Sequence, residues 1–188
     1  MTDSAVFDAC VLYSAPLRDF LLWLGYTGLV RPFWSEEVRN EWIDSLLRKR
    51  SDLKREKLER TCREMDFHFP RALVHGYESL IPTLQLPDPK DRHVLAVAIY
   101  AQAEYIVTFN LKDFPKTILQ AYNVEAVSPD EFVMRLIQNI PDRVLEVVRF
   151  HRLRLKRPPK TVAEYLATLE KQRLPKTVAF LRDHEADI

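Results

Sequence analysis

Short apolar runs alternate with segments of helical spacing, and this alternation is the feature that most constrains the fold. Strands are predicted over residues 5–8, 30–34, 104–108 and 124–127, where apolar residues form short continuous runs. Helices are predicted over residues 16–24 and from Ser35, Asp91 and Ser128 onward. Because strands that alternate with helices form a parallel sheet covered on both faces, we expect an α/β fold. The expected architecture is a three-layer α/β/α arrangement with a central, mainly parallel sheet.

The composition changes beyond Pro141. Six basic residues follow without an intervening acid: Arg149, Arg152, Arg154, Lys156, Arg157 and Lys160. A last helix is predicted from about Thr161, with apolar residues at helical spacing that must pack on the body, on a second copy or on a partner. We therefore expect a domain over residues 1–140 and a basic helical C-terminal extension over residues 141–188.

Composition excludes several classes of protein. The 188 residues contain 28 Lys and Arg against 27 Asp and Glu, so contacts to nucleic acid would have to come from local patches. Only 3 glycines are present, and they fit neither G-x-G-x-x-G nor the Walker spacing, which excludes nucleotide binding by those routes. Two cysteines, Cys10 and Cys62, cannot build a disulfide framework and are expected to be buried as small apolar residues.

No membrane or export signal is expected. The first four residues lack the basic and apolar regions of a signal peptide. The apolar runs Phe20–Leu24 and Val94–Ala101 are far shorter than the ~18 residues of a membrane-spanning helix. We expect a cytoplasmic protein.

Four acids lie at positions where an α/β sheet binds ligands. Asp8 interrupts an apolar strand at its end, where a charge is costly unless it is paired or holds a metal. Asp113 follows the strand that ends at Thr108, Asp91 begins a buried helix, and Glu41 shares a helix face with apolar residues. Several carboxylates around one pocket suit Mg²⁺ or Mn²⁺, which prefer oxygen ligands.

Each acid also has a structural interpretation. Asp91 could cap its helix, since Asp is common at that position. Glu41 could be a solvated surface acid, and Asp113 could stabilise a turn. Asp8 is the hardest to explain structurally, and the four together favour a metal site.

Four segments in the same order resemble the PIN-domain ribonucleases, a family that includes the VapC-type toxins of bacterial toxin–antitoxin pairs. The segments are VFDACVL (6–12), SEEVRNE (35–41), DPKDRHVLA (88–96) and VTFNLKDFP (107–115). The resemblance covers roughly residues 1–129, and only the combination of segments is specific. Beyond about residue 140 the chain departs from the compact toxin pattern.

The resemblance implies a catalytic and metal-binding quartet of Asp8, Glu41, Asp91 and Asp113. It implies supporting roles for Thr108 and Asn110. Asp88 competes with Asp91 for the third place, which we give to Asp91 because it begins the helix. His93 is expected to be peripheral.

The function expected from this resemblance is a metal-dependent endoribonuclease that hydrolyses RNA phosphodiester bonds, the toxin of a toxin–antitoxin pair. The family further implies an antitoxin partner and a homodimer. The basic residues Arg152, Arg154, Lys156 and Arg157 are expected to contact RNA phosphates, although such charge runs are often solvated helix faces. The alternatives are a non-catalytic PIN-like scaffold that binds RNA or protein, and an interaction module whose acids are structural. A serine hydrolase is disfavoured because G-x-S-x-G is absent, and a haloacid-dehalogenase phosphatase because Cys10 stands two positions after Asp8.

Overall fold

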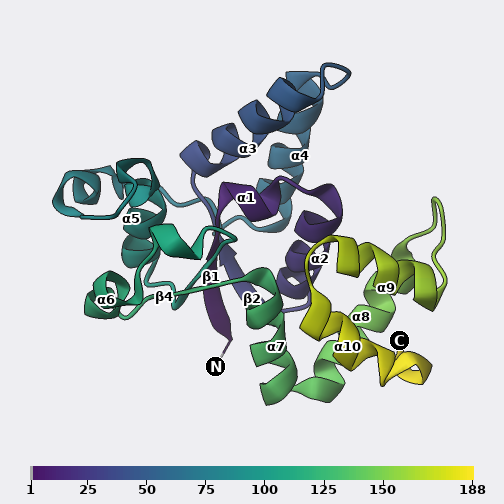
Figure 1. Ribbon diagram of the computed structural model, residues 1–188. Helices are drawn as coiled ribbons and strands as arrows, with labels where there is room; N and C mark the ends of the chain where they lie inside the picture. Colours follow the sequence, from purple (N-terminus) through teal and green to yellow (C-terminus); the bar gives the residue numbers. More distant parts are fainter. Residues whose placement is uncertain (1) are drawn as a thin grey trace.

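A parallel four-stranded sheet lies at the centre of the protein (Figure 1). The computed structural model describes residues 2–188. The strands are β1 (Asp3–Phe7), β2 (Val30–Phe33), β3 (Tyr105–Val107) and β4 (Glu125–Val127), in the order β2-β1-β3-β4. All three pairings are parallel, which confirms the expected α/β class.

Ten α-helices and short 3-10 turns connect or follow the strands within the described residues. The helices are α1 (Ala9–Leu12), α2 (Ala15–Tyr26), α3 (Glu36–Lys49), α4 (Arg55–His68), α5 (Arg92–Ala101), α6 (Lys116–Leu119), α7 (Pro129–Asn139), α8 (Pro141–Arg154), α9 (Val162–Lys171) and α10 (Pro175–Arg182). The 3-10 turns are η1 (Glu78–Thr83), η2 (Pro89–Asp91), η3 (Leu111–Asp113), η4 (Gln120–Tyr122) and η5 (Glu185–Asp187).

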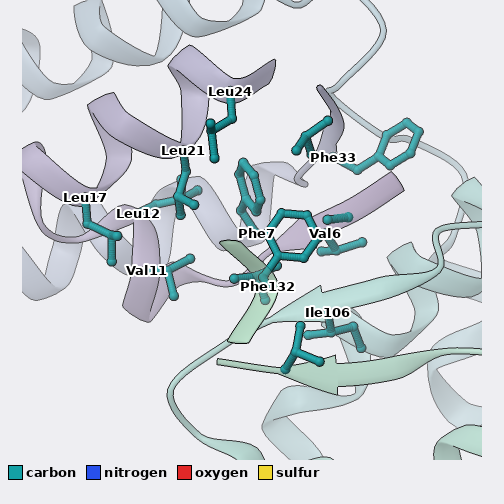
Figure 2. Close-up of a cluster of buried hydrophobic side chains, with 14 of the residues drawn as sticks. Val6, Phe7, Val11, Leu12, Leu17, Leu21, Leu24, Phe33, Ile106 and Phe132 are labelled. Atoms are coloured by element: carbon teal, nitrogen blue, oxygen red, sulfur yellow. The ribbon is translucent and has the colours of Figure 1, made fainter. Parts of the chain in front are cut away.

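Helices cover both faces of the sheet and form the expected three layers. Helix α5 packs against β1, β2 and β3, and six consecutive residues from His93 onward are buried. On the other face, α2 and α7 bring Leu21 and Phe132 against Phe7 of β1 (Figure 2). Burial of these aromatic and aliphatic side chains is the main favourable contribution to folding, about 25 cal/mol per Å² of apolar surface.

The charged stretch after the Ser35 helix contains a second helix. The hydroxyl of Ser35 accepts a hydrogen bond from the Val38 backbone N–H and so begins α3, as expected. Helix α3 ends at Lys49, and α4 follows with its buried residues Leu58, Cys62 and Met65 four and three positions apart. That spacing indicates a helix, although many charged residues surround it.

The C-terminal helices pack on the body of the protein. Helix α8 contacts α2 and α7, α9 contacts α2, and α10 contacts α7 and α9. The apolar face expected after Thr161 is therefore buried within the chain, with Tyr165 and Leu169 each 1% exposed. The carboxylate of Asp130 in α7 accepts hydrogen bonds from the backbone N–H groups of Lys176 and Thr177, which fixes the first turn of α10.

A polar cluster ties α8 and α9 to α2. The buried imidazole of His151 lies 2.8 Å from the hydroxyl of Tyr165 and 3.0 Å from the carboxylate of Asp19. Arg154 pairs with the same carboxylate and lies over the ring of Trp23, 4.5 Å from its centroid.

Across residues 2–188, no helix combines the length and apolarity that spanning a membrane requires.

Candidate active site

Asp8 and Thr108 come together because of the sheet register. Phe7 of β1 pairs with Val107 of β3, so the next residue of each strand lies at the same carboxyl edge. The hydroxyl of Thr108 donates a 2.6 Å hydrogen bond to one carboxylate oxygen of Asp8. The other oxygen accepts a 2.6 Å hydrogen bond from the Ala9 backbone N–H, at the start of α1. Asp8 is 5% exposed and is therefore held in one orientation.

The thiol of Cys10 belongs to this cluster. It lies 3.2 Å from the Asp8 carboxylate and 3.4 Å from the Thr108 hydroxyl. Burial and the negative charge of Asp8 raise the pKa of Cys10 to about 12, so the thiol stays protonated at neutral pH and donates to Asp8. Cys62 is buried as expected, whereas Cys10 is half-buried and polar in its contacts.

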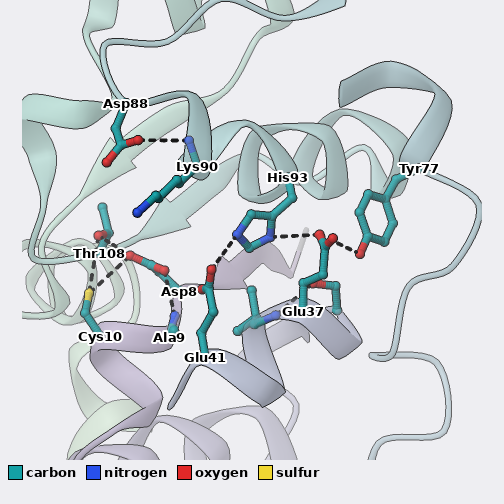
Figure 3. Close-up of polar contacts among 12 residues, drawn as sticks. Asp8, Ala9, Cys10, Glu37, Glu41, Tyr77, Asp88, Lys90, His93 and Thr108 are labelled. Carbon is teal, nitrogen blue, oxygen red and sulfur yellow. Dashed lines mark hydrogen bonds and ion pairs between the residues drawn. The ribbon is translucent and has the colours of Figure 1, made fainter. Parts of the chain in front are cut away.

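Glu41 projects from α3 toward His93 of α5 (Figure 3). Nε2 of His93 lies 3.1 Å from Oε1 of Glu41, and Nδ1 lies 3.4 Å from Oε2 of Glu37. The Tyr77 hydroxyl donates a hydrogen bond to Glu37 at 3.3 Å. Burial disfavours the imidazolium, but the hydrogen bond and charge of Glu41, with the charges of Glu37 and Asp8, raise the pKa of His93. His93, expected to be peripheral, thus directly contacts a candidate site residue.

Asp91 and Asp88 differ in their local roles. Asp88 is exposed, and its carboxylate accepts a 2.9 Å hydrogen bond from the Lys90 backbone N–H, which caps η2. Asp91 occupies the N-cap position of α5 but its side chain makes no capping hydrogen bond. Capping therefore does not account for Asp91, and this difference favours Asp91 as the third acid.

Asp91 is the electrostatic centre of the acidic cluster. Burial raises the pKa of its carboxyl to about 6, assisted by the negative charges of Asp8, Asp88, Asp113 and Glu41. Like charges disfavour the ionised form in this way only when they are close. The four candidate acids thus come from four separate chain segments, and the charges of the other three act on Asp91.

Asp113 and Asn110 lie in the segment after β3. Asp113 ends η3 and is half-buried. Asn110 contributes through its backbone, because its N–H donates a 3.0 Å hydrogen bond to the Thr108 hydroxyl. Its side chain is exposed at the same edge.

The four candidate ligands are all carboxylates, and their oxygen atoms are the kind of ligand that a hard divalent cation prefers. Burial, assisted by the charges of the neighbouring acids, raises the pKa of Asp91, and a bound cation would favour the ionised form. Within residues 2–188, no three Asp, Glu, His or Cys side chains already stand at the spacing of a closed ligand shell. Glu41 contacts His93 through Oε1, which lies 3.1 Å from Nε2.

The basic run of the extension is only partly available to a ligand. Arg152 donates hydrogen bonds to the carbonyl oxygens of Lys160 and Ile188, and Arg154 pairs with Asp19. Lys156 and Arg157 are exposed in the segment after α8.

A cavity of about 730 Å³ lies apart from the acidic cluster, among α2, α4 and the C-terminal helices. Its wall includes Trp23, Tyr26, Phe69 and Tyr165, and none of the four candidate acids is among its lining residues in the described chain. The acids instead gather at the carboxyl edge of the sheet, where open α/β folds bind their ligands.

Comparisons with known proteins agree with this arrangement. Residues 4–112 match the family model described as "PIN domain", and residues 129–183 match the model described as "VapC50 C-terminal domain". The chain is 46% identical over 63 residues to "Putative ribonuclease VapC50" of Mycobacterium tuberculosis (strain ATCC 25618 / H37Rv). That similarity covers 34% of this chain and 37% of the relative, so it spans little more than a third of the relative's length. No solved structure shows a significant match. Because the PIN model covers more than half of the chain and the sheet has the expected parallel order, the chain belongs to the PIN-domain family.

Proposed function

We propose that this chain is a metal-dependent endoribonuclease that hydrolyses RNA phosphodiester bonds. The observation that carries the proposal is the acidic cluster at the carboxyl edge of the sheet, where burial, assisted by the charges of neighbouring acids that include Asp8, Asp113 and Glu41, raises the pKa of Asp91 to about 6. Membership of the PIN family and the ribonuclease name of the relative support the same activity. We assign the catalytic and metal-binding roles to Asp8, Glu41, Asp91 and Asp113.

The residues of the chain prepare the site in two ways. Asp8 is held by the Thr108 hydroxyl and the Ala9 backbone N–H, so its carboxylate needs little rearrangement to bind a cation. Asp91 makes no capping hydrogen bond and keeps its carboxylate available. A bound Mg²⁺ or Mn²⁺ would supply positive charge against the phosphodiester and make a water molecule more acidic.

The proposal includes partners of the VapC-type toxins, namely an antitoxin and a second copy of the chain. It treats residues 1–140 as the nuclease domain and residues 141–188 as the extension. Among the four basic residues expected to contact RNA, Lys156 and Arg157 are the exposed members without intramolecular ion pairs in the described chain. A non-catalytic scaffold is the second candidate, favoured by the open spacing of the acids.

Cleavage of RNA by the purified protein tests the proposal. Asp8→Asn preserves the size and one of the two hydrogen-bond acceptors but removes the charge, so it should abolish Mn²⁺-dependent cleavage while the protein still folds. Glu36→Gln removes an exposed carboxylate from the start of α3 and should cleave as the wild type does. Equal cleavage by wild type and Asp8→Asn would refute the assignment, and metal binding without cleavage would favour the scaffold.

A further inference from the structure

The turn between α9 and α10 lies against the candidate active site. Gln172, at the end of α9, hydrogen-bonds to the Ser14 hydroxyl, at the junction between α1 and α2. The next residue, Arg173, places its guanidinium 4.3 Å from the ring centroid of Phe109. The C-terminal helices therefore contact the site segments that follow both β1 and β3.

Phe109 marks the rim of the acidic cluster. It stands between Thr108 and Asn110, and its backbone N–H donates a 3.3 Å hydrogen bond to the Cys10 thiol, which in turn contacts Asp8. The guanidinium of Arg173 therefore contacts the residue that follows Thr108, whose hydroxyl donates a hydrogen bond to Asp8.

The backbone of Arg173 has a left-handed conformation, with φ +64°. This conformation after a helix is usually taken by glycine, because a side chain there is strained. In this chain an arginine, rather than a glycine, occupies the position. Backbone strain of this kind is concentrated at functional sites, so the strain favours a functional role for the Arg173 side chain.

The guanidinium of Arg173 forms no ion pair within the described residues. The side chain is exposed, and no carboxylate of residues 2–188 lies within ion-pair distance of it. This distinguishes Arg173 from Arg152 and Arg154, whose guanidinium groups bond to carbonyl oxygens and to Asp19. A guanidinium that stacks on a ring through its face still presents all its N–H donors in its plane.

We propose that Arg173 binds a phosphate of the RNA strand beside the scissile bond, so that the C-terminal helices supply a substrate-binding group to the PIN domain. This inference rests on the proposed ribonuclease function. The Phe109 ring holds the guanidinium at the rim of the site, where it would pair with phosphate oxygens, a pairing that arginine makes with two parallel hydrogen bonds. The positive charge at the rim complements the negative charge of the acids, which by themselves would repel RNA.

Binding of a short single-stranded RNA, followed by fluorescence anisotropy, tests the inference. The Asp8→Asn background prevents cleavage during the measurement. Arg173→Gly should weaken binding about tenfold, the loss expected for a charge-assisted hydrogen bond to phosphate. It should also lower the dependence of log K on log salt by roughly 0.7 for one lost phosphate contact. Arg173→Lys should recover part of the affinity but not all of it, because an ammonium lacks the planar fork.

Two further measurements separate binding from structure. Arg173→Gly should melt at the wild-type temperature or above it, because glycine relieves the left-handed strain. Lys171→Ala removes an exposed charge two residues away and should bind RNA as the parent does. Equal affinity of Arg173→Gly and its parent, or an equal loss in Lys171→Ala, would overturn the proposal.

The test is also independent of the ribonuclease activity. If the otherwise wild-type protein fails to cleave RNA while Arg173→Gly still weakens binding, the proposed activity fails and the phosphate contact stands. If the wild type cleaves and Arg173→Gly binds and cleaves equally well, the activity stands and the contact fails. In a cleaving protein, Arg173→Gly should raise KM and leave kcat close to that of the parent.

Discussion

The imidazole of His93 lies between two carboxylates of α3, with Nε2 3.1 Å from Glu41 and Nδ1 3.4 Å from Glu37. His93 is buried at the start of α5, so these contacts connect α5 to α3 across the candidate site. The imidazolium is favoured here despite burial, because the surrounding carboxylates raise the pKa of His93.

His93→Gln should destabilise the protein at pH 6 by about 1–2 kcal/mol, the usual cost of losing a hydrogen bond to a charged group. A raised pKa means that this stabilisation is complete below about pH 6.5, the ordinary value, and is lost as the pH rises through the folded value. The difference between wild type and His93→Gln in urea unfolding should therefore shrink above pH 6.5. His75→Gln, at an exposed position, should show no such difference. A constant difference from pH 6 to pH 9 would contradict this prediction.

Asp91 and Asp88 are separated by one short turn, yet their substitutions should differ in effect. Asp91→Asn should lower Mn²⁺-dependent cleavage by about a hundredfold or more, since the interaction of a carboxylate with a catalytic metal is worth several kcal/mol. Asp88→Asn should retain most of the activity, because Asp88 caps η2 and an amide oxygen can still accept the Lys90 N–H. Initial rates at saturating Mn²⁺ distinguish the two. A larger loss in Asp88→Asn would exchange their roles.

The metal-free protein should lose stability as the pH rises from about 4 to about 6. Burial and neighbouring acids raise the pKa of Asp91 from 3.8 to about 6, so in this window the folded state binds more protons than the unfolded state. Melting curves in EDTA should show this decline in the wild type. Asp91→Asn should show a smaller decline and melt above the wild type at pH 7. The opposite slope would contradict the clustering of the acids.

Mn²⁺ should raise the melting temperature at pH 7. A ligand that binds only the folded state stabilises it by about 2.7 kcal/mol at 100 times its Kd. The carboxylates that repel one another without the ion would then be paired with it, so the gain should be largest in the wild type and smaller in Asp91→Asn. Superimposable melting curves with EDTA and with Mn²⁺ would count against a metal site.

Adjacent acids of α7 should contribute very differently to stability. The buried carboxylate of Asp130 accepts hydrogen bonds from the backbone of Lys176 and Thr177, and from the Thr177 hydroxyl at 2.8 Å. Asp130→Ala leaves the two buried donors of Thr177 unsatisfied and should cost about 2–3 kcal/mol in urea unfolding. Glu131→Ala removes an exposed ion pair with Lys176 and should change stability by less than about 1 kcal/mol. Similar losses in the two variants would mean that α10 does not depend on this cap.

The sequence predicts the sheet because its signals are local. Apolar runs and the caps at Ser35 and Ser128 each depend on neighbouring residues, and the structure has these strands and helix starts. The class of fold follows from their alternation. Helix α4 was not predicted, because its three buried residues lie among many charged ones. The helical spacing is apparent only when the three buried residues are considered without their charged neighbours.

The site is less predictable, because its contacts join residues far apart in the chain. Asp8 and Thr108 are 100 positions apart, and only the register of β1 and β3 places one beside the other. His93 gave no signal of its contact with Glu41, which depends on how α3 and α5 pack. Local spacing identified the acids as unusual, but it could not indicate which basic residues of the extension are engaged within the fold.

The pairing of Phe7 with Val107 has a consequence for the way the site is maintained. The amide of Asp8 donates to the Val107 carbonyl and that of Thr108 to the Val127 carbonyl, so both residues are part of the hydrogen-bonded ladder itself. A slip of one residue would turn both side chains to the opposite face. The orientation of Asp8 is therefore as cooperative as the sheet, and its amide proton should exchange with solvent only when the whole domain opens. The geometry of the candidate site and the global folding of the domain are therefore coupled at Asp8.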